Sequence, residues 1–345
     1  MTGERPLISV IIPTRNRVAF LPDVLGALGE QVCEATFEVI VVDNGSTDRT
    51  GTFLAERSAS QPRLRWLHEP VLGRSVAMNA GVRASRGSLL LFTDDDVMMG
   101  PDWIESYRRF FASRPPTEIV VVGGPIHPVA NDLGPWPAWL GEDAVADLVP
   151  LDLGGAERIL RPPEYVWGAN MAVRARVLDR IGGWDPDIGR RGDDRGTYED
   201  VEYQDRVRAV GGSVWYNPVG RVFHRVPPEL VTPARIMSNA FARGRNAAWG
   251  EEERNAGVED ERPSALVGRF LVWAADTIAF RARRGPRTFD RARLAAAAAG
   301  AAMERCLRHG DRGGAVARAS WWAGRIVVRL AGGSRADHGG PVTPA

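Results

Sequence analysis

The sequence predicts an α/β fold with a mostly parallel, doubly wound sheet, followed by a helical C-terminal extension. Three observations support this prediction. Short β-branched runs alternate with helical segments through the first third of the 345-residue chain. Turn and helix-capping residues follow these runs, at the positions where such sheets bind ligands. Beyond residue 226 only helical patterns remain.

The first third predicts parallel strands, because each strand-like run is separated from the next by a helix. The runs are almost continuously apolar, as in strands that are buried on both faces. The expected strands lie at residues 7–12, 37–42, 64–67 and 88–93. The expected helices between them lie at residues 21–28, 49–58 and 74–84.

The rest of the chain is predicted to be less regular up to residue 225 and helical after it. Further strands are expected at residues 119–122 and 213–216. Helices are expected at residues 199–210, 233–249, 263–283, 287–307 and 314–330. We therefore expect an α/β domain over residues 1–225, a helical region over 226–331 and a disordered tail over 332–345.

The composition limits the chemistry and the location. All 44 basic residues are arginine, which excludes a Schiff-base lysine, a pyridoxal-phosphate enzyme and a P-loop lysine. The chain has 2 cysteines, no signal-peptide pattern and no apolar run long enough to span a bilayer. We therefore expect a cytoplasmic protein.

Charge is distributed unevenly along the chain. Residues 260–345 carry 15 arginines and 7 acids, whereas residues 1–259 carry 29 arginines and 36 acids. The segment 319–329, with two tryptophans and two arginines, is typical of a helix on an anionic membrane surface. Packing against the α/β domain and formation of a homodimer are the alternatives. We expect no nucleic-acid partner.

Three adjacent carboxylates, Asp94, Asp95 and Asp96, follow the strand expected at residues 88–93. Folding alone gives no reason to cluster like charges there. Mg²⁺ and Mn²⁺ bind carboxylate oxygens together with phosphate oxygens, so the triplet indicates a metal-nucleotide site. The alternative is a solvated acidic turn.

Two other enzyme classes with acidic motifs do not fit. A haloacid-dehalogenase phosphatase needs a supporting lysine and has threonine or valine where Met98 stands. A sugar-nucleotide pyrophosphorylase needs a glycine-rich basic loop, which residues 13–16 do not supply.

Four other positions carry candidate chemistry, each with a structural alternative. Asp43 could accept a hydrogen bond from a nucleobase imide, or it could form an Asx turn or cap a helix. Arg74 opens a helix and could meet a pyrophosphate, or it could be solvated. The pair Glu199–Asp200 could supply a general base or only cap a helix. His224 could ligate Mn²⁺ or be structural.

In this order the motifs resemble a family 2 glycosyltransferase of the GT-A fold, over about residues 7–225. The matching segments are Val10–Asn16, Val41–Asp48, Ala77–Gly81, Phe92–Asp96, Gly168–Ala172, Gly182–Asp185, Glu199–Glu202 and His224. The resemblance implies a nucleotide-binding half over residues 1–123 and an acceptor half over 124–225. It also implies transfer of a sugar from a nucleoside diphosphate donor with inversion, assisted by Mn²⁺ or Mg²⁺.

The resemblance also implies roles at matching positions. Asp200 would be the base with Glu199 on the acceptor, while Asp96 and His224 would hold the metal. The implied donor contacts are Pro13, Thr14, Arg15, Asn16, Asp43, Arg74, Asn79, Asp94 and Asp95. The implied acceptor or sugar contacts are Gly168, Ala169, Asn170 and Trp184. Met78 departs from the family, which commonly has arginine there.

The expected donor is a nucleoside diphosphate sugar, with a UDP-sugar favoured. The expected acceptor is a hydroxyl of a saccharide, a lipid-linked glycan or a secondary metabolite. The charged segment 189–197 is interpreted as a loop that gates the acceptor. Two alternatives stay open, namely a non-catalytic nucleotide-sugar or glycan-binding protein on the same fold, and a nucleotidyltransferase.

Overall fold

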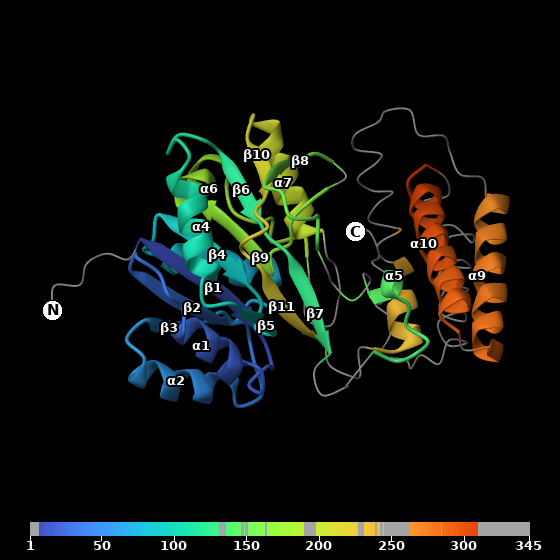
Figure 1. Cartoon of the computed structure of the whole chain (residues 1–345), viewed down its shortest axis with the longest axis horizontal. Helices are drawn as coiled ribbons and strands as arrows, with labels where there is room; N and C mark the ends of the chain where they lie inside the picture. The colour runs from blue at the N-terminus through green and yellow to red at the C-terminus, as the bar shows by residue number, and fades with distance from the viewer. Residues whose placement is uncertain are drawn as a thin grey trace. The chain divides into compact units, whose positions relative to one another are not determined.

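The computed structural model describes residues 7–130, 136–145, 148, 151–162, 164–189, 198–226, 231–238, 240–241, 244, 263–283 and 285–309. The chain folds as two compact units (Figure 1). The first comprises residues 1–127 and 150–225, and the second comprises residues 128–149 and 226–345. None of the helices within the described ranges is long and apolar enough to cross a membrane.

The first unit is built on an eight-stranded sheet of order β3-β2-β1-β4-β9-β6-β10-β8. Four parallel strands form one half: β1 (Ile8–Thr14), β2 (Phe37–Asp43), β3 (Leu64–His68) and β4 (Leu89–Thr93). The α/β prediction is confirmed, and these strands lie where the apolar runs predict them. Almost every residue of β1, β2 and β4 is buried, as continuous apolar runs require.

The other half of the sheet is mixed because of β9 (Asn170–Arg174), which runs antiparallel to both neighbours. The sequence pattern does not predict this strand. The remaining strands of the sheet are β6 (Val120–Gly123), β10 (Ser213–Tyr216) and β8 (Arg158–Leu160). A second sheet contains β5 (Val97–Met99), β11 (Val222–Val226) and β7 (Ile126–Ala130). Antiparallel pairing sets His224 of β11 opposite Val97, the residue that follows the acid triplet.

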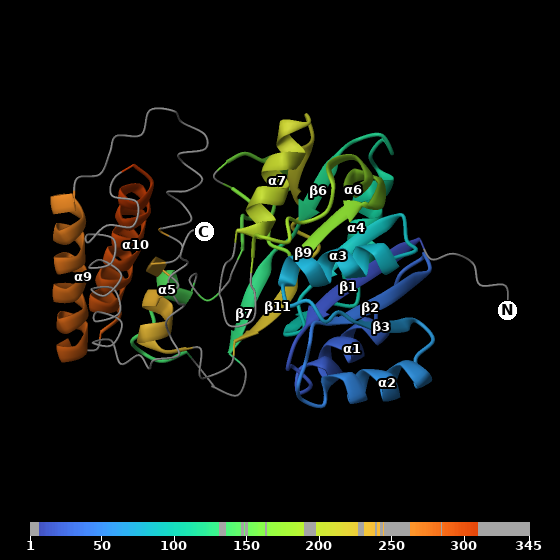
Figure 2. The same cartoon turned by 180° about the vertical axis from the view of Figure 1, so that it is seen from behind.

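Helices cover the sheet of the first unit. Figure 2 shows α3 and α7 over one face, and Figure 1 shows α4 over the other. The helix bounds are α1 (Leu21–Gly29), α2 (Thr50–Ser60), α3 (Arg74–Ala84), α4 (Trp103–Ala112), α6 (Ala175–Ile181) and α7 (Glu199–Ala209). The predictions for α3 and α7 are confirmed to within one residue, whereas α4 and α6 were not predicted.

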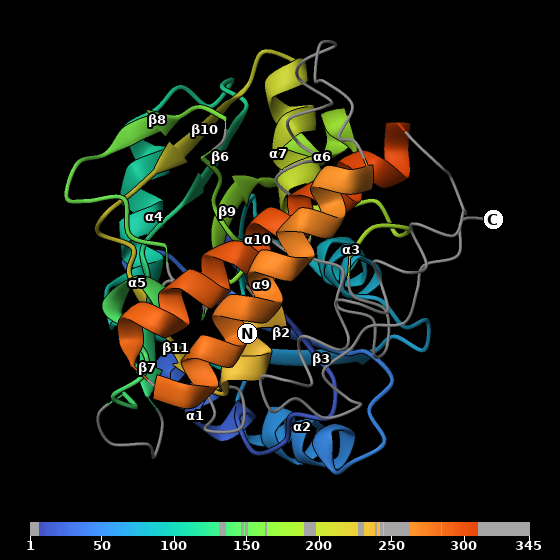
Figure 3. The same cartoon turned by 90° about the vertical axis from the view of Figure 1, so that its right-hand side faces the viewer.

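The second unit is helical. Its long helices α9 (Pro263–Arg283) and α10 (Pro286–His309) lie side by side (Figure 3), and α5 (Glu142–Val145) packs on α10. Its core contains Trp273, Phe280 and Phe289. The predictions for α9 and α10 are confirmed. The helix predicted at 314–330, most of the segment 189–197, part of 233–249 and the tail at 332–345 lie outside the described residues.

Close packing of α3 on β1 depends on a glycine. A Cβ atom at Gly81 would overlap the Ile11 side chain and lie 3.3 Å from Val42 Cγ2. Gly81→Ala is therefore expected to lower the free energy of unfolding by about 1–3 kcal/mol. A Cβ atom at Gly26 of α1 would meet nothing within 4 Å. Gly26→Ala should therefore raise the free energy of unfolding by about 0.5–1 kcal/mol. Urea unfolding measures both changes in the free energy of unfolding. Changes of the same sign in the two variants would contradict the close packing of α3 on β1.

Candidate active site

The carboxyl ends of β1, β2 and β4 bring polar residues to one edge of the sheet. Register sets Thr14, the last residue of β1, beside Asp43, the last residue of β2. The acid triplet follows β4 directly. Thr14 Oγ1 donates a hydrogen bond to Asp95 Oδ2 at 2.6 Å, which ties the ends of β1 and β4 together. This edge is where ligands bind in open parallel sheets.

The three carboxylates of the triplet have different partners. Asp94 Oδ1 lies 2.9 Å from Arg74 Nη2. Asp95 is buried, and its Oδ2 accepts the hydrogen bond from Thr14 Oγ1. Asp96 Oδ1 lies 3.2 Å from His224 Nε2, and its Oδ2 lies 3.6 Å from Arg17 Nη2. All three carboxylates therefore have partners within the protein, and Asp95 and Asp96 are buried while Asp94 is about one-third exposed, so the triplet is not a solvated turn.

The pair Asp96–His224 joins two residues that are far apart in the sequence. Burial alone would lower the pKa of His224, but its hydrogen bond to Asp96 and the nearby negative charges raise it on balance. Both side chains are about one-tenth exposed, at 10% and 11%. One carboxylate oxygen and one imidazole nitrogen fit the ligand preferences of Mn²⁺. Within the described ranges, no group of three or more His, Cys, Asp or Glu side chains is arranged to hold a metal ion.

Asp95 is expected to make stability depend on pH. Burial, helped by the charge of Asp96, raises the pKa of Asp95 to about 7, against the opposing effects of Arg17 and Thr14. The folded state therefore holds this proton more tightly than the unfolded state. Between about pH 4 and pH 7, wild type should lose stability relative to Asp95→Asn as the pH rises, and the difference should then level off. Urea unfolding in EDTA measures this difference, and a difference independent of pH would contradict it.

The acid pair lies at the start of α7 and faces the same arginine. Arg74 Nη1 is 3.2 Å from Glu199 Oε1 and 3.4 Å from Asp200 Oδ1. The other oxygen of Asp200 accepts a hydrogen bond from the Gly168 backbone N–H at 2.7 Å. Arg74 Nη1 also lies 3.2 Å from Met78 Sδ, so the guanidinium group contacts the Met78 side chain. Position 78 is the one at which the family that the motifs resemble commonly has arginine. Arg74 thus joins the acid triplet to the acid pair, and it is not solvated.

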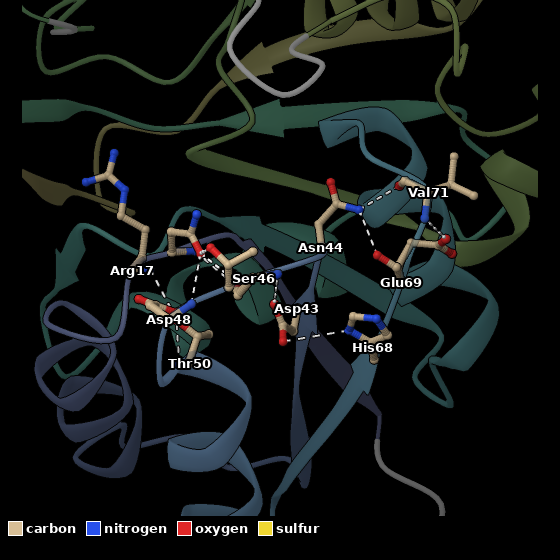
Figure 4. Close-up of polar contacts among 11 residues, drawn as sticks. Arg17, Asp43, Asn44, Ser46, Asp48, Thr50, His68, Glu69 and Val71 are labelled. Carbon is tan, nitrogen blue, oxygen red and sulfur yellow. Dashed lines mark hydrogen bonds and ion pairs between the residues drawn. The ribbon is translucent and has the colours of Figure 1, made fainter.

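Asp43 makes a local side-chain to backbone hydrogen bond in the turn after β2, which reaches the third residue on and not the second as in an Asx turn (Figure 4). Its Oδ1 accepts a hydrogen bond from the Ser46 backbone N–H at 3.0 Å. Its Oδ2 lies 3.8 Å from Nδ1 of His68, a half-exposed side chain at the end of β3. The turn occupies one carboxylate oxygen, so the nucleobase contact stays a prediction.

Two asparagines shape the loops at this edge. Asn16 has φ 54°, and its Oδ1 accepts hydrogen bonds from the backbone N–H groups of Thr47 and Asp48 at 2.7 and 3.3 Å. Asn44 Oδ1 accepts the Gly73 N–H at 2.8 Å, which fixes the residue before Arg74. Asn44 lies within a matching motif, but the motif indicates no function for it. Arg17 was not predicted, because an arginine in a turn forms no recognisable sequence pattern.

Three residues expected at the donor or the sugar make hydrogen bonds or ring contacts within the protein. Asn170 is fully buried, and all four hydrogen-bonding positions of its side chain are occupied within the chain. Asn79 exchanges two hydrogen bonds with the backbone of Trp184, at 2.7 and 2.9 Å. Trp184 is buried and stacks on Tyr203 at 4.4 Å between ring centroids. Asn170 and Trp184 are thus buried by these contacts, whereas Asn79 is half-buried.

The remaining predicted residues lie close to this edge. Pro13 pairs with Val42 in the sheet register. Arg15 is half-buried, and its Nε atom has no hydrogen-bond partner in the part of the chain that the structure describes. The carbonyl of Ala169 accepts a hydrogen bond from Thr93 Oγ1 at 3.0 Å, which holds the segment containing Gly168 against β4.

Comparisons with known proteins agree with this architecture. Validoxylamine A glucosyltransferase from Streptomyces hygroscopicus subsp. jinggangensis (strain 5008) is 29% identical over 231 residues, which cover 61% of this chain and 53% of the relative. The chain thus spans about half the length of that relative. Glycosyltransferase AglE from Haloferax volcanii is 34% identical over 126 residues, covering 36% of this chain and 40% of AglE.

A solved structure shows the same fold. The mannosyltransferase PcManGT from Pyrobaculum calidifontis, in complex with GDP-Man and Mn²⁺, superposes with a TM-score of 0.51 at 18% identity, covering 95% of this chain and 86% of that chain. The family model described as "Glycosyl transferase family 2" matches residues 9–181, half of the chain. The chain therefore belongs to glycosyl transferase family 2.

Proposed function

We propose that this protein transfers a sugar from a nucleoside diphosphate sugar, with a UDP-sugar favoured, to a hydroxyl group, with inversion and with help from Mn²⁺ or Mg²⁺. One observation carries the proposal. Arg74 joins a candidate base at the start of α7 to the acid triplet at the end of β4, through contacts of 2.9–3.4 Å. A candidate base and a candidate diphosphate-metal site are thereby held next to each other, as sugar transfer requires.

Asp200 is the proposed general base. Its carboxylate would take the proton of the acceptor hydroxyl while that oxygen bonds to the anomeric carbon and the bond to the diphosphate oxygen breaks. A single displacement of this kind inverts the anomeric centre. Glu199, buried beside Asp200, would orient the acceptor.

The donor would bind at the ends of β1, β2 and β4. Asp43 would accept a hydrogen bond from the nucleobase, and Asp94 would contact the ribose. Asp96 and His224 would hold a divalent ion, which when bound offsets the negative charge of the diphosphate leaving group. Arg17, 3.6 Å from Asp96, adds a positive charge at the same place.

The acceptor is proposed by chemical class. The match to validoxylamine A glucosyltransferase favours an acceptor such as the validoxylamine A of that relative's name over a lipid-linked glycan. Membrane contact or dimerisation through the C-terminal helices and a cytoplasmic location are further parts of the proposal. Flotation with anionic liposomes at low salt tests the membrane contact, and absence of binding would remove it.

Release of nucleoside diphosphate tests the function directly. The full chain is incubated with UDP-glucose, GDP-mannose or dTDP-glucose, with Mn²⁺ or EDTA, and with or without validoxylamine A. We expect metal-dependent release from one donor class. Donor binding without release would favour the binding-protein alternative, and pyrophosphate formation from UTP and a sugar 1-phosphate would favour a nucleotidyltransferase.

A further inference from the structure

Arg74 lies among carboxylates from two different elements. Its side chain is 14% exposed. Nη2 contacts Asp94 at 2.9 Å, while Nη1 contacts Glu199 at 3.2 Å and Asp200 at 3.4 Å. The two Nη atoms of one planar group therefore serve the two sides of the site separately. A lysine ammonium is a single point charge and could not bridge them in this way.

Asp200 is held at both carboxylate oxygens. Oδ1 faces Arg74, and Oδ2 accepts the Gly168 N–H at 2.7 Å. Gly168 also has no space for a side chain, because a Cβ atom there would lie 2.7 Å from Arg74 Nη2 and 2.8 Å from Asp200 Oδ1. The backbone at Gly168 thus packs directly against the Arg74–Asp200 ion pair.

The first turn of α3 is itself fixed, so Arg74 has a defined starting point. Gly73 adopts φ 153°, and its N–H is bound by Asn44 Oδ1 at 2.8 Å. On the other side of Arg74, Ser75 Oγ donates to the Ile188 carbonyl at 2.7 Å. The helix start is therefore tied both to the turn after β2 and to the chain that precedes α7.

We propose that Arg74 and Gly168 form a clamp, in which the Arg74 guanidinium and the Gly168 N–H together position the Asp200 carboxylate. The contact of Arg74 Nη2 with Asp94 connects this proposed base to the donor site. The inference rests on the proposed function. It assigns Arg74 and Gly168 as positioning residues, since they act on the reaction through Asp200. The competing role for Arg74 is direct binding of the donor pyrophosphate.

Kinetics of Arg74→Lys separate these two roles. Charge is kept but the bridge is lost, so kcat for UDP release from UDP-glucose at saturating donor should fall on the order of 100-fold. The fold decrease in kcat should exceed any fold increase in the Kd for UDP in the presence of Mn²⁺. Arg83→Lys, a mostly exposed position in the same helix, is the matched control and should change neither value. A raised Kd with unchanged kcat would assign Arg74 to the pyrophosphate and overturn the clamp.

Gly168→Ala tests the clamp without changing any charge. The added methyl group must displace Arg74 or Asp200, so kcat should again fall while UDP binding is kept. Gly155→Ala is the control, because a Cβ atom there would meet nothing within 4 Å. Unchanged kcat in Gly168→Ala would contradict the proposed closeness of the three groups.

A thermal double-mutant cycle tests the clamp independently of activity. The loss of Tm in Arg74→Met/Asp200→Asn should be smaller than the sum of the two single losses, because the charges that face each other are removed together. Arg83→Met combined with Asp200→Asn should be additive. Additive losses in the first pair would overturn the clamp whatever the turnover. Non-additive losses without turnover of any donor would keep the clamp and overturn the proposed function.

Discussion

Asp200→Asn is expected to lower kcat by on the order of 100- to 10,000-fold, the typical contribution of a positioned general base. The amide has nearly the same shape as the carboxylate, and its oxygen can still accept the Gly168 N–H. It cannot take a proton from the acceptor. UDP binding in the presence of Mn²⁺ should therefore be kept while transfer is lost.

The control for this substitution is Asp179→Asn, at an exposed position of α6. It removes the same charge outside the site and should leave kcat unchanged. Nucleoside diphosphate release under saturating donor measures both variants. Full activity of Asp200→Asn would show that another group accepts the proton, and parallel loss of UDP binding would assign Asp200 to the donor instead.

Asn170→Ala is expected to produce the largest loss of stability, about 4 kcal/mol or more in the free energy of unfolding. The side chain makes four buried hydrogen bonds of 2.7–3.0 Å. Their partners are Trp103 Nε1, Tyr107 OH and the carbonyl oxygens of Pro125 and Gly220. Each partner left buried and unpaired costs about 1–3 kcal/mol.

Asn79→Ala should lower the free energy of unfolding less than Asn170→Ala does. The Asn79 side chain makes two hydrogen bonds, both to the backbone of one residue. Urea unfolding with an unchanged m-value measures both losses. A stable Asn170→Ala variant with a raised KM for the acceptor would return Asn170 to the sugar site, as the motif resemblance implied.

Much of the fold could be predicted because its central strands are continuous apolar runs. Such runs mark β1, β2 and β4 whatever the rest of the chain does. The antiparallel strand β9 could not be predicted in the same way. It has five residues, and its direction is set by the connection that brings it back between β4 and β6.

The site shows the same division between local and long-range information. Sequence position predicts that Asp43 and the acid triplet lie at the carboxyl ends of parallel strands, since only the β–α alternation is needed. It does not tell whether a motif side chain points to the ligand or into the core. Asn170 and Trp184 lie in matching motifs, yet both are buried within the scaffold. The convergence of Glu199 and Asp200 on Arg74 also depends on contacts across more than 100 positions of the chain.

The central claim is that a metal and a nucleoside diphosphate bind together at Asp96 and His224. A thermal-shift measurement of wild type and Asp96→Asn with UDP, with and without Mn²⁺, tests it most directly. At about 100 times Kd, UDP with Mn²⁺ should stabilise wild type by about 2.7 kcal/mol. Asp96→Asn should lose the metal-dependent part of this shift. An equal shift in EDTA, or no shift with UDP, GDP or dTDP under either condition, would contradict the claim.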